Sequence, residues 1–225
     1  FLSSSGIDWI FQIGQQLYVS ARGSSFNNYL YSVNPENGRN RLLAIGTAFA
    51  SATEVIFTGC GFLSRIWIGT SRATRGQIHY LRSEDDSTWT LERTAAANHH
   101  VYTSMAQFRG NLYASTGALS GTAAIIERRT PAGVWSTSRT GSLSTQNNKF
   151  DGLTVHNDEL YAVYVANGAT DICEVHKFDG SSWVVDEDLF AFGGASSEFV
   201  TGIAAGDGNL FFATTRPAGN TRIMK

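Results

Sequence analysis

The sequence predicts an all-β fold, a five-bladed β-propeller of four-stranded antiparallel blades. A pattern of about 48 residues recurs along the chain, and each copy holds four segments rich in β-branched and aromatic residues. No window shows the 3.6-residue apolar period of an amphipathic helix. Because four short strands in every 40 to 50 residues is the size of a propeller blade, stacked blades are expected to bury the core.

The second strand of each copy is marked by an aliphatic residue followed by an aromatic one. The aliphatic residues are separated by 49, 46, 48 and 50 residues. Recurrence of the aromatic residue in every copy favours a role in packing between blades. The five pairs are Leu17-Tyr18, Ile66-Trp67, Leu112-Tyr113, Leu160-Tyr161 and Leu210-Phe211.

A tryptophan column lies 23 residues after the aliphatic column in the second to fourth copies, at Trp89, Trp135 and Trp183. Each tryptophan follows a cluster of turn-forming residues and starts the predicted fourth strand. A second turn, such as Arg109-Gly110, precedes the aliphatic column. Each copy therefore reads as strand, tight turn, strand, longer loop, strand, tight turn, strand. The tryptophans are expected to pack the blade rather than to stack on sugars.

The predicted organisation is a single propeller domain over residues 1–225 that belongs to a longer chain. Its repeats, called repeats 1 to 5 below, cover approximately residues 1–47, 48–95, 96–141, 142–190 and 191–225. Repeat 5 ends before its expected turn and fourth strand, so one blade is expected to lack its outer strand. Two explanations are open: the ring closes with one short blade, or flanking chain supplies that strand or further blades.

The composition restricts the kinds of partner that we expect for this chain. The net charge of −2 and the lack of a Lys/Arg cluster argue against nucleic-acid binding. No apolar run approaches the roughly 18 residues of a membrane helix, so no membrane insertion is expected. Cys60 and Cys173 stand in apolar strands and are expected to be buried free thiols. No zinc-type Cys/His spacing is present, and neither a metal nor a cofactor is expected.

The recurring aliphatic, aromatic and tryptophan positions resemble those of bacterial-type propeller repeats with a Leu-Tyr-Ala and Phe-Asp-Gly-x-x-Trp pattern. This is the Asp-box and kelch-like group. The best copy runs from Leu160-Tyr161-Ala162 to Phe178-Asp-Gly-Ser-Ser-Trp183, and Ser83 to Trp89 is similar to the Asp-box turn of sialidase-type propellers. The five-blade count is similar to tachylectin-like lectins and to arabinanase and invertase-type glycosidases, whose distinctive motifs are absent. The resemblance implies the architecture; repeats of this kind occur in lectins, adhesins, scaffolds and glycosidases alike.

Weak candidates for catalysis are Asp8 and Asp151, which stand nine residues before the aliphatic column in repeats 1 and 4. Glu54 and Glu198 lie a few positions earlier in their own repeats. A glycosidase needs two carboxylates that converge on the scissile bond. A strand-start aspartate that caps a turn explains the same two residues, so the enzyme hypothesis ranks third.

Weak candidates for ligand binding lie in the loops between second and third strands, which vary in sequence and are rich in Gly, Ser, Asn and Arg. Variable loops on a repeated frame are where binding is expected. His99 and His100 point to opposite sides of a strand and therefore form a poor metal pair. The candidates in these loops are Arg22, Arg72 and Arg75, and the other two candidates, His99 and His100, begin the link into repeat 3.

Three function classes follow in order of expectation. The first is a non-catalytic binding or adhesion module that recognises a glycan or protein on a secreted or particle-surface protein. The second is an assembly module of a larger extracellular or virion-like particle, and the third is a five-bladed glycoside hydrolase. Low lysine content, many Ser, Thr, Asn and Gly residues and a first residue other than Met favour an extracellular or particle-surface location.

Overall fold

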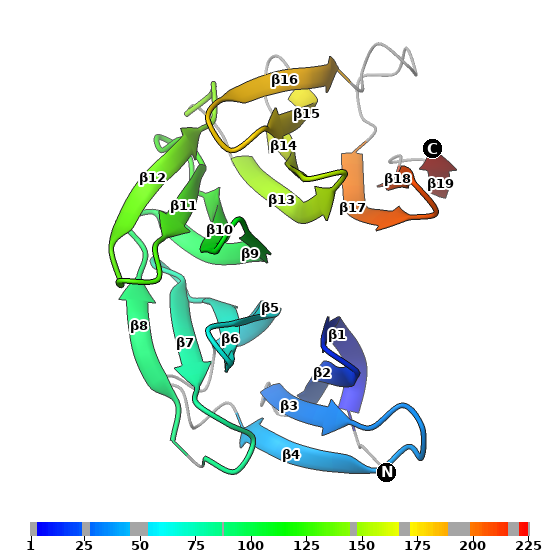
Figure 1. The fold of residues 1–225 in the computed structure, drawn as a ribbon. Coiled ribbons are helices and arrows are strands. Elements are labelled where there is room, and N and C mark those ends of the chain that lie inside the picture. Colours follow the sequence, from blue (N-terminus) through cyan, green and yellow to red (C-terminus); the bar gives the residue numbers. More distant parts are fainter. Residues whose placement is uncertain are drawn as a thin grey trace. The chain divides into compact units, whose positions relative to one another are not determined.

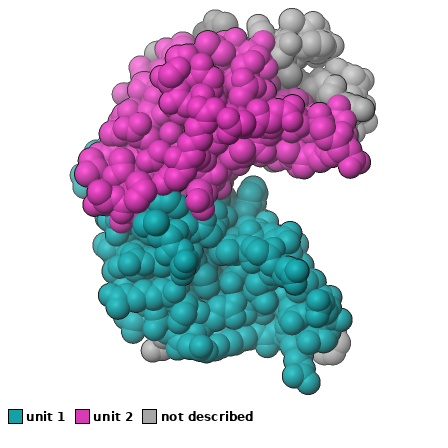
Figure 2. All heavy atoms as spheres, viewed as in Figure 1, with its two compact units in different colours: residues 1–102 teal, residues 103–225 magenta. Residues whose placement is uncertain are grey.

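The computed structural model describes residues 4–23, 28–45, 54–86, 88–144, 148–166, 172–188, 199–215 and 221–224. These residues form an all-β structure with 19 strands (Figure 1). The chain divides into two compact units, residues 1–102 and residues 103–225 (Figure 2). Among the described residues there is no helix long and apolar enough to cross a bilayer.

Unit 1 contains repeats 1 and 2, and each forms a four-stranded antiparallel meander in chain order. Strand β6 also pairs with β9 at Ser71 and Val101. The strands are β1 (Ser4–Ile13), β2 (Gln16–Gly23), β3 (Asn28–Val33), β4 (Asn40–Ile45), β5 (Val55–Phe62), β6 (Arg65–Ser71), β7 (Gln77–Leu81) and β8 (Thr90–Thr94).

Unit 2 contains two further four-stranded meanders, of repeats 3 and 4, and the three-stranded antiparallel sheet of repeat 5. The boundary between the units falls within β9. The strands are β9 (His99–Phe108), β10 (Asn111–Ala118), β11 (Ile125–Arg129), β12 (Trp135–Thr140), β13 (Asn148–His156), β14 (Glu159–Ala166), β15 (Ile172–Phe178), β16 (Trp183–Asp188), β17 (Phe199–Gly206), β18 (Asn209–Thr215) and β19 (Thr221–Met224).

The strand order within each repeat confirms the order predicted from the columns. In repeat 1, Ile13 pairs with Gln16 and Val33 with Asn40, so both tight turns lie at one end of the meander. We call this the tight-turn end. The connection between second and third strands lies at the opposite end, called the long-loop end, because successive strands run antiparallel.

Positive backbone φ angles explain the sequence of the turns between first and second strands. Gly14 supplies the positive φ of a II′-type turn in repeat 1. In the other repeats both central residues have positive φ, the pattern of a type I′ turn, which favours Asn, Asp and Gly. These pairs are Leu63-Ser64, Arg109-Gly110, Asn157-Asp158 and Asp207-Gly208.

The Leu63-Ser64 turn is expected to be strained, since its φ angles of 50° and 55° fall on residues that rarely adopt them. Replacing the pair with Asn-Gly (Leu63→Asn with Ser64→Gly) should raise the free energy of unfolding by about 1 kcal/mol, measured by urea denaturation. Leu63 is exposed, so little burial is lost. Gln15→Gly is the control, because Gln15 has no positive φ. A loss of stability in the Asn-Gly variant would contradict this account of the turn.

The aromatic column packs neighbouring repeats together, as the sequence predicts. Trp67 is fully buried, and its Nε1 donates a 2.8 Å hydrogen bond to the Phe62 carbonyl. In repeat 1, the Tyr18 hydroxyl donates to Glu84 of repeat 2 over 2.7 Å. In unit 2, the rings of Tyr113 in repeat 3 and Phe178 in repeat 4 lie 5.8 Å apart between centroids. The column therefore supplies contacts between repeats within each unit.

The tryptophan column also has a packing role where its contacts are described. Trp89 Nε1 donates to the Leu43 carbonyl of the preceding repeat over 3.4 Å. Trp183 Nε1 donates to Ser138 Oγ of the preceding repeat over 2.9 Å, and its ring stacks on Phe178 at 5.0 Å. These bonds tie the outer strand of one repeat to that of its neighbour.

The Phe178-Asp-Gly-Ser-Ser-Trp183 segment shows why its pattern recurs. Asp179 Oδ1 accepts the backbone N–H groups of Ser181 and Ser182 at 2.7 and 2.8 Å. These bonds favour the charged form and lower the pKa of Asp179 to about 2. Gly180 supplies a positive φ of 98°. The aspartate thus closes the turn that delivers Trp183 to the face of Phe178.

Small residues on the first strands allow neighbouring repeats to approach. A Cβ atom on Gly59 of β5 would overlap the ring of Phe11 in β1. In unit 2, a Cβ atom on Gly152 of β13 would overlap the side chain of Ile203 in β17. Inner strands of successive repeats therefore interlock, large residue against small, within each unit.

Both cysteines carry free thiols, as expected from their apolar surroundings. Cys173 is buried, whereas Cys60 as a residue is only partly buried. Burial of its thiol nevertheless raises the pKa of Cys60 to about 12. A thiol with so high a pKa holds almost no thiolate at neutral pH and is a poor nucleophile.

Candidate functional site

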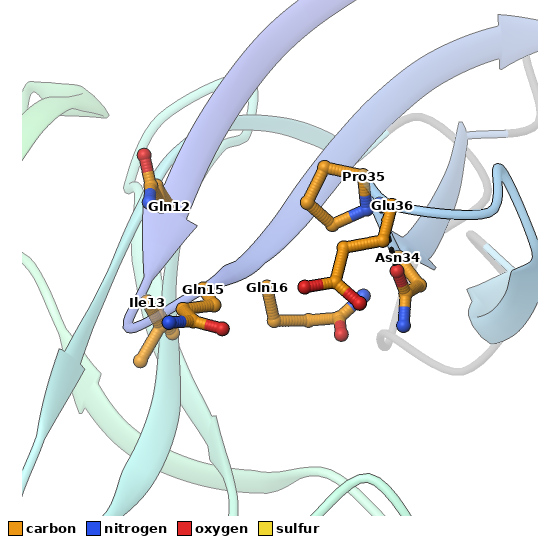
Figure 3. Close-up of a pocket in the computed structure, with 7 residues that line it drawn as sticks. All are labelled: Gln12, Ile13, Gln15, Gln16, Asn34, Pro35 and Glu36. Atoms are coloured by element: carbon orange, nitrogen blue, oxygen red, sulfur yellow. Dashed lines mark hydrogen bonds between the residues drawn. The ribbon is translucent and has the colours of Figure 1, made fainter.

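A polar groove of about 570 Å³ opens at the tight-turn end of repeat 1 (Figure 3). Its volume lies in the range of small-molecule binding sites. One wall comes from the β1–β2 hairpin and the other from the β3–β4 turn. The lining residues are Gln12, Ile13, Gln15, Gln16, Asn34, Pro35 and Glu36.

Local hydrogen bonds fix both walls of the groove. Asn34 Oδ1 accepts the backbone N–H of Glu36 at 2.9 Å, and the Asn34 carbonyl accepts that of Gly38 at 2.9 Å. These bonds form an Asx-type turn around Pro35. On the hairpin, Gln12 Nε2 donates to the Gly14 carbonyl at 2.7 Å. The groove is therefore pre-formed by turn chemistry.

The groove offers hydrogen-bonding groups that the protein does not use. Within the described residues, the side chains of Gln15, Gln16 and Glu36 make no hydrogen bond. Figure 3 shows their head groups and that of Asn34 around one space, whereas Gln12 points away from it. Each amide can donate twice and accept, and the carboxylate accepts only. This mixture suits a ligand rich in hydroxyl groups, which both donate and accept.

A second polar cluster surrounds Glu54 at the long-loop end of repeat 2. The Glu54 side chain is 0% exposed and precedes β5 directly. Its Oε1 accepts a hydrogen bond from Thr70 Oγ1 and lies 3.2 Å from His79 Nε2. Its Oε2 lies 3.9 Å from Arg72 Nε. A buried carboxylate that is surrounded in this way holds strands and loop together and is closed to a large ligand.

All five candidate binding residues belong to unit 1, and four of them lie around the loop that follows β6. The backbone carbonyls of His100 and His99 accept the N–H groups of Arg72 and Gly76 at 2.8 and 2.7 Å. His99 is buried, and His100 is half-buried. Burial, and then the neighbouring His99, lowers the pKa of His100. Arg75 is exposed, and backbone bonds join the loop that holds Arg72 to His99 and His100.

The fifth binding candidate and the two catalytic candidates remain predictions. The side chains of Arg22 and Asp8 lie outside the described residues. Asp151 Oδ2 forms an ion pair with Lys149 Nζ at 2.6 Å, and Asp151 Oδ1 accepts the backbone N–H of Gly152 at 2.8 Å. Its described contacts are those of a carboxylate that shapes a strand. Within the described part of the chain, no group of three or more His, Cys, Asp or Glu residues is arranged to hold a metal ion.

Sequence reasoning missed the groove because it assigned binding to the long loops. The groove lies at the opposite end of repeat 1, between two turns whose residues were interpreted only as turn formers. A signal was present: three glutamines fall within five residues at Gln12, Gln15 and Gln16. Such a concentration of long amide side chains on one hairpin exceeds what the turn needs.

Comparisons with known proteins identify the fold and no family. No protein-family model matches the chain, and no curated protein matches it. Among solved structures, AofleA from Arthrobotrys oligospora matches with a TM-score of 0.65 at 10% identity, over 99% of this chain and 70% of that one. The sialidase of Trypanosoma rangeli in complex with the inhibitor DANA matches with a TM-score of 0.62 at 11% identity, over 99% of this chain and 46% of that one.

A third match is the extracellular domain of a protein from B. thetaiotaomicron named as a hybrid two-component system. The TM-score is 0.63 at 11% identity, over 96% of this chain. The chain spans only 27% of that domain and 46% of the sialidase. At such low identity the likeness concerns the fold alone. The neighbours are propeller-type domains, and this chain has an all-β fold of the same type.

Proposed function

We propose that this chain is a non-catalytic binding module that takes a glycan in the groove of repeat 1. The observation that carries the proposal is the set of unengaged amide and carboxylate groups of Gln15, Gln16 and Glu36 around one pre-formed space. Sugar hydroxyls both donate and accept hydrogen bonds, which matches this set. A groove of about 570 Å³ has room for a few sugar residues rather than for a protein surface.

The groove favours binding over catalysis. Glu36 is the one carboxylate among its seven lining residues. Hydrolysis of a glycosidic bond normally uses a pair of carboxyl groups about 5 to 10 Å apart. A lone carboxylate among amides serves recognition instead.

We further propose that the module works on the outside of a cell or particle. One structural neighbour is the extracellular domain of a bacterial protein, and another is a sialidase bound to an inhibitor. These likenesses concern the fold, and they support an extracellular setting only as an analogy. The polar, turn-rich surface fits the same setting.

We propose that the five repeats are the blades of a five-bladed propeller whose fifth blade lacks its outer strand. The five-fold recurrence of the aliphatic and aromatic pair, and the strand order that the repeats share, support this proposal. Flanking chain is the proposed source of the missing strand, and an experimental structure of the full-length protein tests both points.

Removal of the groove amides should weaken glycan binding. Each lost hydrogen bond costs about 0.5–1.5 kcal/mol, so Gln15→Ala with Gln16→Ala should weaken binding by about tenfold or more. The ligand is first found on an immobilised glycan array, and affinity is then measured by calorimetry. Gln107→Ala, on an exposed glutamine of β9, is the matched control and should leave affinity unchanged.

Two outcomes would overturn the site. Binding that survives the double glutamine substitution but is lost in Arg72→Ala with Arg75→Ala would move it to the long-loop end. Absence of binding to every glycan on the array would reject the glycan-binding function itself and would favour an assembly role.

A further inference from the structure

The groove carries one charge. Of the seven lining residues, six are uncharged and the seventh is Glu36. Two arginines lie nearby in the chain but do not line it. Arg39 closes the β3–β4 turn through its carbonyl, which accepts the Asn34 N–H at 2.9 Å, and the guanidinium of Arg41 is paired with Asp85 at 2.7 Å. The groove is therefore locally acidic, and no lining cation offsets Glu36.

The Glu36 carboxylate can only accept hydrogen bonds. A sugar hydroxyl or an ammonium group beside it can donate, and an ammonium does so with the added attraction of opposite charge. A sugar carboxylate offers no donor and meets a like charge. The neutral groups of Gln15, Gln16 and Asn34 do not distinguish among these three classes, since amides donate and accept.

From this we infer that the groove prefers neutral and amino-bearing glycans over acidic ones, with Glu36 as the discriminating residue. The inference rests on the proposed glycan-binding function and adds the ligand class. Sialylated and uronic-acid glycans should bind more weakly than neutral ones, and glycans that contain free glucosamine-type amines should bind more tightly.

The exposure of Glu36 sets the size of the affinity difference between acidic and neutral glycans. Glu36 is exposed, so water and salt screen its charge. Charge pairs of this kind change affinity by about two- to fivefold. A change of this size should shrink as salt increases, because the Debye length falls from about 10 Å at 0.1 M to about 3 Å at 1 M. The contacts of the amides with hydroxyls should be insensitive to salt.

Three tetrasaccharides with one linkage test the inference on the whole chain: β-1,4-linked glucose, glucosamine and glucuronic acid. Calorimetry at low salt should give the tightest binding for glucosamine and the weakest for glucuronic acid, with steps of about two- to fivefold. At 1 M salt the three affinities should converge. Glu36→Gln keeps the size of the side chain and one acceptor oxygen, and it replaces the charge with a neutral amide. It should leave glucose binding within about twofold and abolish the order among the three ligands.

Each outcome decides the matter. Equal binding of the three tetramers by the wild-type protein, or an order that persists in Glu36→Gln, overturns the charge selection and leaves glycan binding intact. Failure of all three tetramers, when the array has identified another glycan, also overturns the selection alone. Failure of these tetramers together with an empty array rejects the proposed function as well.

Discussion

Replacing Trp67 with alanine is expected to lower the free energy of unfolding by about 3–5 kcal/mol, which we expect to be the largest loss from a single substitution in repeat 2. Trp67 is 0% exposed, and its ring lies 5.8 Å from Phe62 and 5.0 Å from Tyr80 between centroids. Truncation would leave a cavity among these rings. It would also deprive the Phe62 carbonyl of the 2.8 Å hydrogen bond from Trp67 Nε1.

Urea and thermal unfolding measure this effect. Trp67→Phe fills most of the space but lacks the N–H, so its loss should be smaller than that of alanine. Trp89→Ala is the comparison for a half-buried member of the tryptophan column and should cost less than Trp67→Ala. A loss below about 1 kcal/mol for Trp67→Ala would show that the aromatic column is not the packing element described here.

Replacing Glu54 with alanine is expected to cost about 3 kcal/mol, because it removes one partner of a buried charged cluster. His79 Nε2 would lose the carboxylate 3.2 Å away, Thr70 Oγ1 would keep only the Gln77 carbonyl as an acceptor, and Arg72 would lose the carboxylate 3.9 Å away. Arg72 is about one-third exposed and can turn to water. Most of the cost should therefore come from the buried His79 and Thr70.

Glu54→Gln separates the hydrogen bonds from the charge. A glutamine oxygen can still accept from Thr70 and His79, so this variant should lose less stability than Glu54→Ala. Arg75→Ala, an exposed residue of the same loop, should change the free energy of unfolding by less than about 0.5 kcal/mol. Equal stability of Glu54→Ala and the wild-type protein in urea unfolding would contradict the structural role of this cluster.

The repeat architecture could be predicted from sequence because each repeat solves the same packing problem. An aromatic residue after the aliphatic column must fill the space between sheets, and it therefore recurs at Tyr18, Trp67, Tyr113 and Tyr161. Backbone geometry also sets the tight turn between the first and second strands. Even Leu63 and Ser64, which rarely adopt positive φ angles, do so at this turn. Such periodic requirements are visible in one sequence without any relative.

The polar clusters could not be predicted in the same way, since they depend on which side chains meet across strands. Glu54 was noted only as a possible acid, and nothing in the sequence shows that His79, 25 residues later, faces it. A column was nevertheless available: the position 12 residues before the aliphatic column holds Ser5, Glu54, His100, Asn148 and Glu198.

Asn148 shows what this polar column does in another repeat. It is buried, its Oδ1 accepts the Ala124 N–H at 2.5 Å, and its Nδ2 donates to the Thr122 carbonyl at 2.9 Å. Asn148 thus holds the long loop of the preceding repeat, as Glu54 holds that of its own. In repeats 2 and 4 the polar residue of this column therefore holds a long loop in place.

The groove escaped prediction for a different reason. It is formed by one repeat alone and breaks the periodicity on which the sequence argument depends. No glutamine stands at the same turn of repeats 2 to 4, where Ser64, Gly110 and Asp158 take the place of Gln15 and Arg65, Asn111 and Glu159 that of Gln16. Positions at which one repeat differs from the others can form a specific site on a shared fold.

Amide NMR of the intact chain with the glycan that the array identifies tests the central claim most directly. The side-chain NH₂ groups of Gln15, Gln16 and Asn34 give their own resonances and report on the groove itself. The account predicts shifts for these groups and for the backbone of residues 12–16 and 34–36. Shifts confined to residues 71–76 and His99-His100, or a spectrum that this glycan leaves unchanged, would contradict it.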